Sequence, residues 1–259
     1  NVALALRERL YTQPYYRLLF GEADGVPGVV VDRYGDYLAV QITTAGMEAQ
    51  REALVAALVK VLKPAGIILR NDTSVRELEG LTRYVELAHG SVPEMVAIEE
   101  DGCRCEVSPG QGQKTGWFYD QAANRGQFVR YVGGKRVLDV CSYIGAWAVR
   151  AAKAGAENVI AVDVSAQALE QVAHNASLNG VGERIHSVRG DAFQVLRDLR
   201  AQRERFDVVV LDPPAFIKRR KDLKEGTLAY RRLNEAALGL LERDGVLVTA
   251  SCSFHMQRD

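Results

Sequence analysis

The sequence has 259 residues and a formal net charge of zero, with 47% hydrophobic and 25% charged residues. These values are ordinary for one large or two modest globular domains, and they argue against a wholly basic nucleic-acid binder. No apolar run approaches the length of a membrane span, and the N-terminus lacks the apolar core of a signal peptide, so we expect no membrane partner.

Four cysteines are spread along the chain without a CxxC pair and without a histidine at the spacing of a zinc ligand. They are Cys103, Cys105, Cys141 and Cys252. We expect reduced thiols, a cytoplasmic protein and no metal.

The first part of the chain predicts a small α/β domain over residues 1–108, for which a role with RNA or substrate is open. The expected elements are a hairpin over 28–43 that turns at Tyr34-Gly35-Asp36, a helix over 47–62, a strand over 65–71, and strands near Val92–Glu99 and Cys103–Ser108. The stretch 109–117 is rich in Gly and Pro and is expected to join this domain to the next.

From about Val137, short apolar strands alternate with helical stretches, which is typical of a doubly wound, mostly parallel α/β sheet of Rossmann type. The expected strands are 136–142, 158–164, 184–190, 206–212 and 245–251, and the expected helices are 145–155, 165–180, 191–204 and 227–245. We therefore place a second domain at 109–259.

The turn after the first of these strands indicates which nucleotide the domain binds. Only Gly145 stands where a dinucleotide fingerprint needs three glycines, and a phosphate-binding loop is absent. Asp163 ends the second strand and could accept both ribose hydroxyls. Asp191 follows the third strand and could accept from an adenine amino group, with Phe193 beside the ring. This pattern favours S-adenosylmethionine, with Asp212 near its sulfonium.

A plainer interpretation is that these aspartates only cap the helices that follow, since Asp favours that position. Three acids at the ends of successive strands favour a shared ligand over three separate caps.

Asp212 and Cys252 together predict chemistry. Asp212 opens a DPP turn after the fourth strand, and Cys252 lies in an SCS triplet after the fifth. Ligands of open α/β sheets bind outside the carboxyl ends of the strands, so we expect both side chains to face one crevice.

The segment from Phe216 to Arg232 has seven basic and two acidic residues, a net charge of +5. It follows the DPP turn directly and could hold RNA phosphates, although it could also be an ordinary exposed loop. The residues assigned to RNA are Lys218, Arg219, Arg220 and Lys221.

Several strings resemble one known family. They are KTGWFYDQAANR, VLDVCSYIGAWAVRAA, VIAVDVSAQALEQVAHNASLNG, FDVVVLDPPAF and SCS, with GVPGVVVDRYGDYLAVQ and IILRNDTSVRELEG upstream. In content and order they resemble the RlmI-like ribosomal RNA cytosine-C5 methyltransferases, class I enzymes that use S-adenosylmethionine. Members of that family carry an N-terminal RNA-binding PUA domain and two more strands, so the resemblance implies part of a longer protein, with a sheet truncated after its fifth strand.

The resemblance and the strand-end pattern together define the expected site. For the cofactor these residues are Asp139, Ser142, Tyr143, Gly145, Asp163, Asp191, Ala192, Phe193, Asp212 and Pro213, with Lys114 and Asp120 from a helical lid that also includes Thr115, Phe118 and Arg125. The lid residues could instead form a solvated helix face. The catalytic residues are Cys252 and Asp212.

The implied reaction forms 5-methylcytosine in ribosomal RNA. A thiolate of Cys252 would add to carbon 6 and make carbon 5 nucleophilic, while Asp212 would hold the cytosine edge. No base for the carbon-5 proton is assigned, and His255 is a weak candidate. A buried structural role is the alternative for Cys252, and Cys141 is expected to shape the cofactor turn.

Three other functions remain open. Methyltransferases that act on exocyclic nitrogens place an aromatic directly after the prolines, where this chain has Ala215 and only then Phe216. A non-catalytic module that binds S-adenosylmethionine or RNA is the second alternative, and a nicotinamide dehydrogenase is a distant third. A homodimer is also left open.

Overall fold

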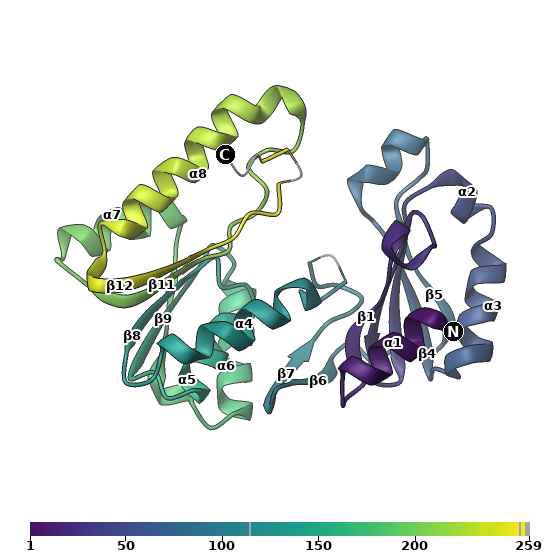
Figure 1. Cartoon of the computed structure of the whole chain (residues 1–259), viewed down its shortest axis with the longest axis horizontal. Helices are drawn as coiled ribbons and strands as arrows, with labels where there is room; N and C mark the ends of the chain where they lie inside the picture. The colour runs from purple at the N-terminus through teal and green to yellow at the C-terminus, as the bar shows by residue number, and fades with distance from the viewer. Residues whose placement is uncertain (114, 254, 257–259) are drawn as a thin grey trace. The chain divides into compact units, whose positions relative to one another are not determined.

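The computed structural model describes residues 1–113, 115–253 and 255–256. It contains two compact units, Asn1–Ala122 and Ala123–Asp259 (Figure 1). Within the described residues, no helix is both long and apolar enough to cross a membrane.

The first unit is built on a five-stranded sheet in the order β1-β2-β3-β4-β5. Its elements are α1 (Val2–Leu10), β1 (Tyr15–Phe20), η1 (Gly21–Asp24), β2 (Val29–Tyr34), β3 (Tyr37–Ile42), α2 (Ala45–Glu48), α3 (Arg51–Leu62), β4 (Gly66–Asn71), η2 (Ser74–Glu79), β5 (Tyr84–Gly90), the hairpin β6 (Val96–Glu100) and β7 (Cys103–Val107), and η3 (Tyr119–Gln121). The expected hairpin is present, because Tyr34 pairs with Tyr37 across a two-residue turn in which Gly35 has φ +64°. The core packs Leu58 of α3 against the sheet.

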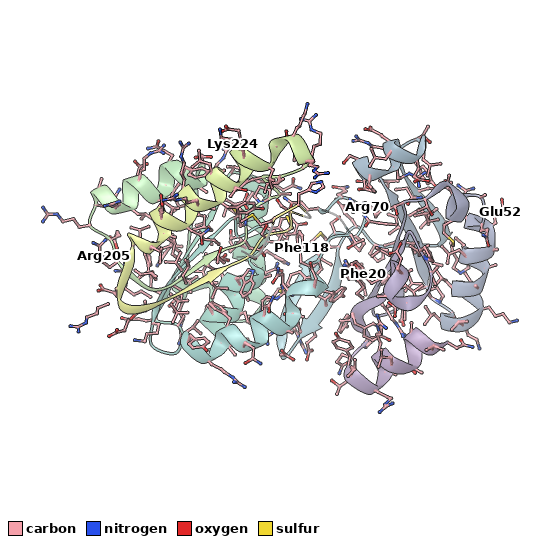
Figure 2. The ribbon with its side chains drawn as sticks, turned by 45° about the horizontal axis from the view of Figure 1, so that its top comes forward. Phe20, Glu52, Arg70, Phe118, Arg205 and Lys224 are labelled. Atoms are coloured by element: carbon pink, nitrogen blue, oxygen red, sulfur yellow. The ribbon has the colours of Figure 1, made fainter. Side chains whose placement is uncertain are left out.

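The segment after β7 belongs to the first unit, which places the boundary later than the 108/109 division expected from the sequence. Arg70, labelled in Figure 2, is buried and donates to the backbone carbonyls of Pro109 and Gly112. Thr115 Oγ1 donates to the buried carboxylate of Asp32. These contacts join residues far apart in the sequence, so composition alone did not reveal them.

The second unit is a parallel sheet in the order β10-β9-β8-β11-β12. Its elements are α4 (Ala122–Phe128), η4 (Val129–Tyr131), β8 (Arg136–Val140), α5 (Ala146–Lys153), β9 (Asn158–Asp163), α6 (Ala166–Leu178), η5 (Gly182–Arg184), β10 (Ile185–Arg189), α7 (Ala192–Ala201), β11 (Phe206–Leu211), η6 (Arg220–Asp222), α8 (Leu223–Leu238) and β12 (Leu241–Thr249). The doubly wound α/β fold expected from the sequence is confirmed.

Alternation along the central strands produces two cores, one on each face of this sheet. Val137 of β8 packs with α5 and α6, whereas its neighbour Leu138 packs with α7 and α8. Figure 1 shows α7 and α8 on one side of the sheet and α5 and α6 on the other. Because side chains alternate along a strand, continuous apolar runs such as FDVVVL supply both faces.

The last helix differs from its expected extent of 227–245. It ends at Leu238, and Leu241 already pairs with Phe206 as the first residue of β12. Gly245 therefore lies inside the strand instead of stopping the helix. The sequence LLERDG fits a helix by propensity, but pairing with β11 overrides that preference.

Candidate active site

The turn after β8 is the most unusual backbone segment of the second unit. Cys141 and Tyr143 have φ values of +65° and +49°, and Gly145 has +86°. Left-handed conformations at two non-glycine residues are costly and tend to occur at functional sites. A Cβ on Gly145 would also lie 3.1 Å from the Val172 side chain, so any other residue would add a tight contact to a strained backbone.

Two polar side chains hold this turn in place. Asp163, at the end of β9, accepts from the backbone N–H of Tyr143 at 2.9 Å and from that of Ser165 at 2.9 Å. Asn175, fully buried on α6, donates through Nδ2 to the carbonyl of Ile144 at 3.0 Å. Sequence reasoning identified Asp163 but missed Asn175, for which the only signal was a polar residue on the apolar face of a helix.

Asp139 is a buried carboxyl whose hydrogen bonds are incomplete. Its Oδ2 accepts from the backbone N–H of Ala148 at 3.0 Å, whereas neither its Oδ1 nor the hydroxyl of Ser142 has a hydrogen-bond partner within the described residues. Burial, followed by the negative charges of Asp212 and Asp163, raises the pKa of Asp139 to about 8. Buried polar atoms without partners are rare in folded proteins, and here they mark a place for a polar ligand.

The carboxylates at the strand ends act together on the thiol of Cys141. Burial raises the pKa of the Cys141 thiol to about 12, and four negative charges contribute to that rise. They belong, in decreasing order of effect, to Asp163, Asp139, Asp212 and Asp191. The raised pKa disfavours the thiolate of Cys141, which is the nucleophilic form of a cysteine.

Asp191 is exposed and caps α7, because its Oδ1 accepts from the backbone N–H of Gln194 at 3.1 Å. For this oxygen the plainer cap interpretation is correct, although the residue also contributes to the electrostatic field at Cys141. Ala192 and Phe193 follow it and are half-buried. The Phe193 ring lies 6.3 Å from that of Phe216, so the β10 and β11 loops meet through these two aromatics.

Asp212 is oriented by a tryptophan that the sequence analysis did not single out. Trp147 Nε1 donates to Asp212 Oδ2 at 3.1 Å from the first turn of α5. The indole is buried, with the Phe128 ring against it at 85° and the Arg125 guanidinium 6.0 Å from its centroid. One face of the Asp212 carboxylate is thus fixed by a side chain that packing keeps in one orientation.

Cys252 is exposed and adjoins the DPP turn, as the sequence predicted. Its Sγ donates to the carbonyl of Pro213 at 3.8 Å. The backbone N–H of Ala250 still bonds to the carbonyl of Leu211 at 2.9 Å, so the two strand ends stay paired up to this point. Among the four described cysteines, Cys252 is exposed, Cys141 is half-buried, and Cys103 and Cys105 are buried.

The basic side chains after the DPP turn are exposed, whereas Ile217 and Tyr230 of the same segment are buried. Lys218, Arg219, Arg220 and Lys221 are all exposed, and Arg219 forms an ion pair with Asp222 at 3.1 Å. Lys224, labelled in Figure 2, continues this charge into the first turn of α8.

The expected lid residues are divided between the two units. Arg125 lies on α4 of the second unit, with its guanidinium 6.0 Å from the centroid of the Trp147 ring. Asp120 is exposed in η3 of the first unit, and the Thr115 side chain is buried against Asp32 in that same unit. Lys114 lies outside the described residues. Within the described chain, no group of His, Cys, Asp and Glu is arranged to hold a metal ion.

The comparisons with known proteins fit this geometry. The family model described as S-adenosylmethionine-dependent methyltransferase matches residues 81–254. The chain belongs to this family. The expected cofactor, S-adenosylmethionine, is confirmed by that membership, and a methyltransferase suits a turn that lacks a phosphate-binding loop.

Individual relatives of this methyltransferase are similar over most of the chain. The ribosomal RNA large subunit methyltransferase I of Cronobacter sakazakii is 42% identical over 250 residues, covering 94% of this chain and 62% of the relative. The protein of that name from Vibrio cholerae is 41% identical over 242 residues, covering 92% and 61%. The chain therefore spans less than two thirds of the length of these relatives. The fold also matches the crystal structure of SMU.776 complexed with SAH, with a TM-score of 0.86, 24% identity, and coverage of 99% of this chain and 67% of that one.

The residues present fit S-adenosylmethionine. Asp139 Oδ1 and the Ser142 hydroxyl are buried acceptors without partners beside a left-handed turn, which suits the ammonium group of an amino acid. Asp163 and Asp191, at the next two strand ends, suit a ribose and an adenine.

Proposed function

We propose that this methyltransferase forms 5-methylcytosine in RNA, with ribosomal RNA as the leading substrate. The observation that carries the proposal is the exposed thiol of Cys252 at the end of β12, hydrogen-bonded to Pro213 directly after Asp212. Methyl transfer to carbon 5 needs such a nucleophile, and transfer to a ring or exocyclic nitrogen does not. The names of the curated relatives support ribosomal RNA as the substrate.

The Cys252 thiol, once deprotonated, would add to carbon 6 of the cytosine, forming an S–C bond and moving the ring electrons toward carbon 5. S-adenosylmethionine, when bound, supplies a methyl group on a sulfonium. The carbon-5 proton must then pass to a base so that the S–C bond breaks and Cys252 is released. Within the described residues, the candidate for that base is His255, which is half-buried three residues after Cys252.

Asp212 would hold the cytosine edge while charge shifts toward N3 of the ring. Trp147 fixes Oδ2 of this carboxylate, so its orientation is set before substrate arrives. Such preorganisation lowers the cost of alignment during the reaction.

The distribution of charge supports RNA contact through the second unit. Residues 1–122 contain 12 basic and 17 acidic side chains, whereas residues 123–259 contain 21 basic and 16 acidic. The difference makes the second unit +5, the same as the net charge of residues 216–232 alone. Because carbons 5 and 6 are hidden in a duplex, we propose that this segment holds a single-stranded or flipped nucleotide. A cytoplasmic location and a homodimer belong to this proposal as predictions.

Covalent trapping tests the proposal. RNA that contains 5-fluorocytosine should form a stable adduct with the full-length protein and S-adenosylmethionine, because fluorine cannot leave carbon 5 as a proton does. The adduct should disappear in Cys252→Ala, with methyl transfer reduced at least about 1000-fold, and should persist in Cys141→Ala. Full activity of Cys252→Ala, or a methylated nitrogen in the nucleoside products, would refute carbon-5 transfer in favour of the nitrogen alternative.

A further inference from the structure

Two hydroxyl groups join the loop after β11 to the segment that carries Cys252. Ser253 is buried, and its Oγ accepts from the backbone N–H of Ile217 at 3.0 Å. The same oxygen lies 2.8 Å from the hydroxyl of Tyr230 on α8. The backbone N–H of Phe216 in turn lies 3.4 Å from that Tyr230 hydroxyl. We call the Tyr230 and Ser253 hydroxyls the hydroxyl bridge.

The surroundings of the hydroxyl bridge are tightly packed. The Phe216 ring lies 4.7 Å from the Tyr230 ring, and Ile217 is buried. A Cβ at Gly226, one turn before Tyr230 on α8, would lie 2.4 Å from Ile217 and 2.8 Å from the Phe216 carbonyl. Helix α8 can therefore approach the loop this closely only because residue 226 is glycine. This close approach gives Tyr230 its hydrogen-bonding position.

The catalytic thiol itself has much weaker support. Cys252 immediately precedes Ser253 but is exposed, and within the described residues its Sγ makes one long hydrogen bond, to the carbonyl of Pro213. β12 ends at Thr249, so ladder pairing does not fix residues 252–253. The position of the thiol over the DPP turn must then come mainly from its buried neighbour.

We propose that Tyr230 and Ser253 are positioning residues for Cys252, an inference that rests on the proposed function. By bonding to the two backbone N–H groups that follow the DPP turn, the hydroxyl bridge holds Cys252 and Asp212 in one geometry. It also connects the thiol to α8 and to Lys218–Lys221, which directly follow Ile217. RNA phosphates held by that basic segment would act on the same loop that the hydroxyl bridge holds.

The test compares Tyr230→Phe, Ser253→Ala and the double variant with wild type in the full-length protein. At saturating S-adenosylmethionine and 5-fluorocytosine RNA, each single variant should slow adduct formation about 10–100-fold, the cost of misplacing a reacting group by about an ångström. The double variant should be no slower than the worse single variant, since both changes remove one bridge. The affinity for S-adenosylmethionine, measured by calorimetry, should stay within about twofold, because a bridge outside the β8 turn does not touch the cofactor.

Two controls remove a hydroxyl of the same kind elsewhere in the second unit. Tyr131→Phe changes a half-exposed tyrosine, and Ser177→Ala changes an exposed serine on α6. Both should form the adduct at the wild-type rate. Adduct formation at the wild-type rate in Tyr230→Phe and Ser253→Ala would overturn the positioning role while leaving the proposed function intact.

A second measurement works without the methyltransferase reaction. The alkylation rate of Cys252 by iodoacetamide, followed by peptide mass spectrometry, should change at least about threefold in the two bridge variants and not in the controls, because thiol reactivity depends on access and surroundings. If wild type forms no adduct with RNA, the proposed carbon-5 reaction fails, and unchanged alkylation rates then overturn the positioning role as well.

Discussion

Buried charges are handled in opposite ways in the two units. In the first unit they are paired with opposite charges: Asp32 is bound by Arg17 at 2.8 and 3.0 Å, and Arg76 by Glu48 at 2.9 Å. In the second unit, the buried carboxyl of Asp139 lies among like charges instead, and burial followed by the charges of Asp212 and Asp163 raises its pKa to about 8. Paired charges specify structure, whereas like charges held together are kept for a ligand or a reaction. This contrast identifies the second unit as the chemical one.

Breaking a pair in the first unit should give the largest effect on stability. Asp32→Ala leaves Arg17 and Thr115 without their shared partner, so the free energy of unfolding of the first unit should fall by about 3–5 kcal/mol. Hydrogen exchange resolved by peptide measures each unit separately. The control is Asp36→Ala, which changes an exposed aspartate in the same hairpin. It should change the free energy of unfolding of the first unit by less than about 0.5 kcal/mol. Equal loss of protection in both variants would show that the pairing is not the cause.

Removing a carboxylate from the second unit should instead act on the ligand. Asp163→Ala should weaken S-adenosylmethionine binding by about 1–3 kcal/mol in calorimetry, since it removes a polar partner and loosens the Tyr143 turn. Asp207→Ala is the matched control, because Asp207 lies at the opposite end of the sheet, bound to Lys135 and the Arg136 N–H. That variant should lose stability and keep cofactor affinity. Unchanged affinity in Asp163→Ala would remove Asp163 from the site.

The smallest expected effect concerns pH. The pKa of Asp139 is about 8 in the folded protein and about 3.9 in an unfolded chain, so the folded state holds the proton more tightly. Protonation of Asp139 therefore stabilises the folded second unit. This contribution to the free energy of unfolding is complete below about pH 4 and is lost as the pH rises through about 8. Asp139→Asn should therefore flatten this decline and raise the stability of the ligand-free second unit at pH 8 by at least about 1 kcal/mol, while weakening cofactor binding. Parallel stability curves for the variant and wild type between pH 5 and 8 would contradict the raised pKa.

The sequence by itself determined the sheet of the second unit and the acids at its edge. Asp163, Asp191 and Asp212 could be placed because parallel strands bring their carboxyl ends to one edge, whatever the packing of the helices. Cys252 could be placed at the same edge, because it follows the fifth parallel strand. The local signals of turn and strand are strong in this part of the chain, with Gly145 at the cofactor turn and two prolines after β11.

Only the tertiary structure revealed the side chains that hold those acids and the thiol in place. Asn175, Trp147 and Tyr230 are helical residues, and their roles depend on how each helix is rotated and how closely it approaches a loop. The same is true of Thr115, which belongs to the first unit because its hydroxyl reaches Asp32 across 83 residues of sequence. Hydrogen bonds between distant residues leave no periodic pattern, so they become visible only when the chain is folded.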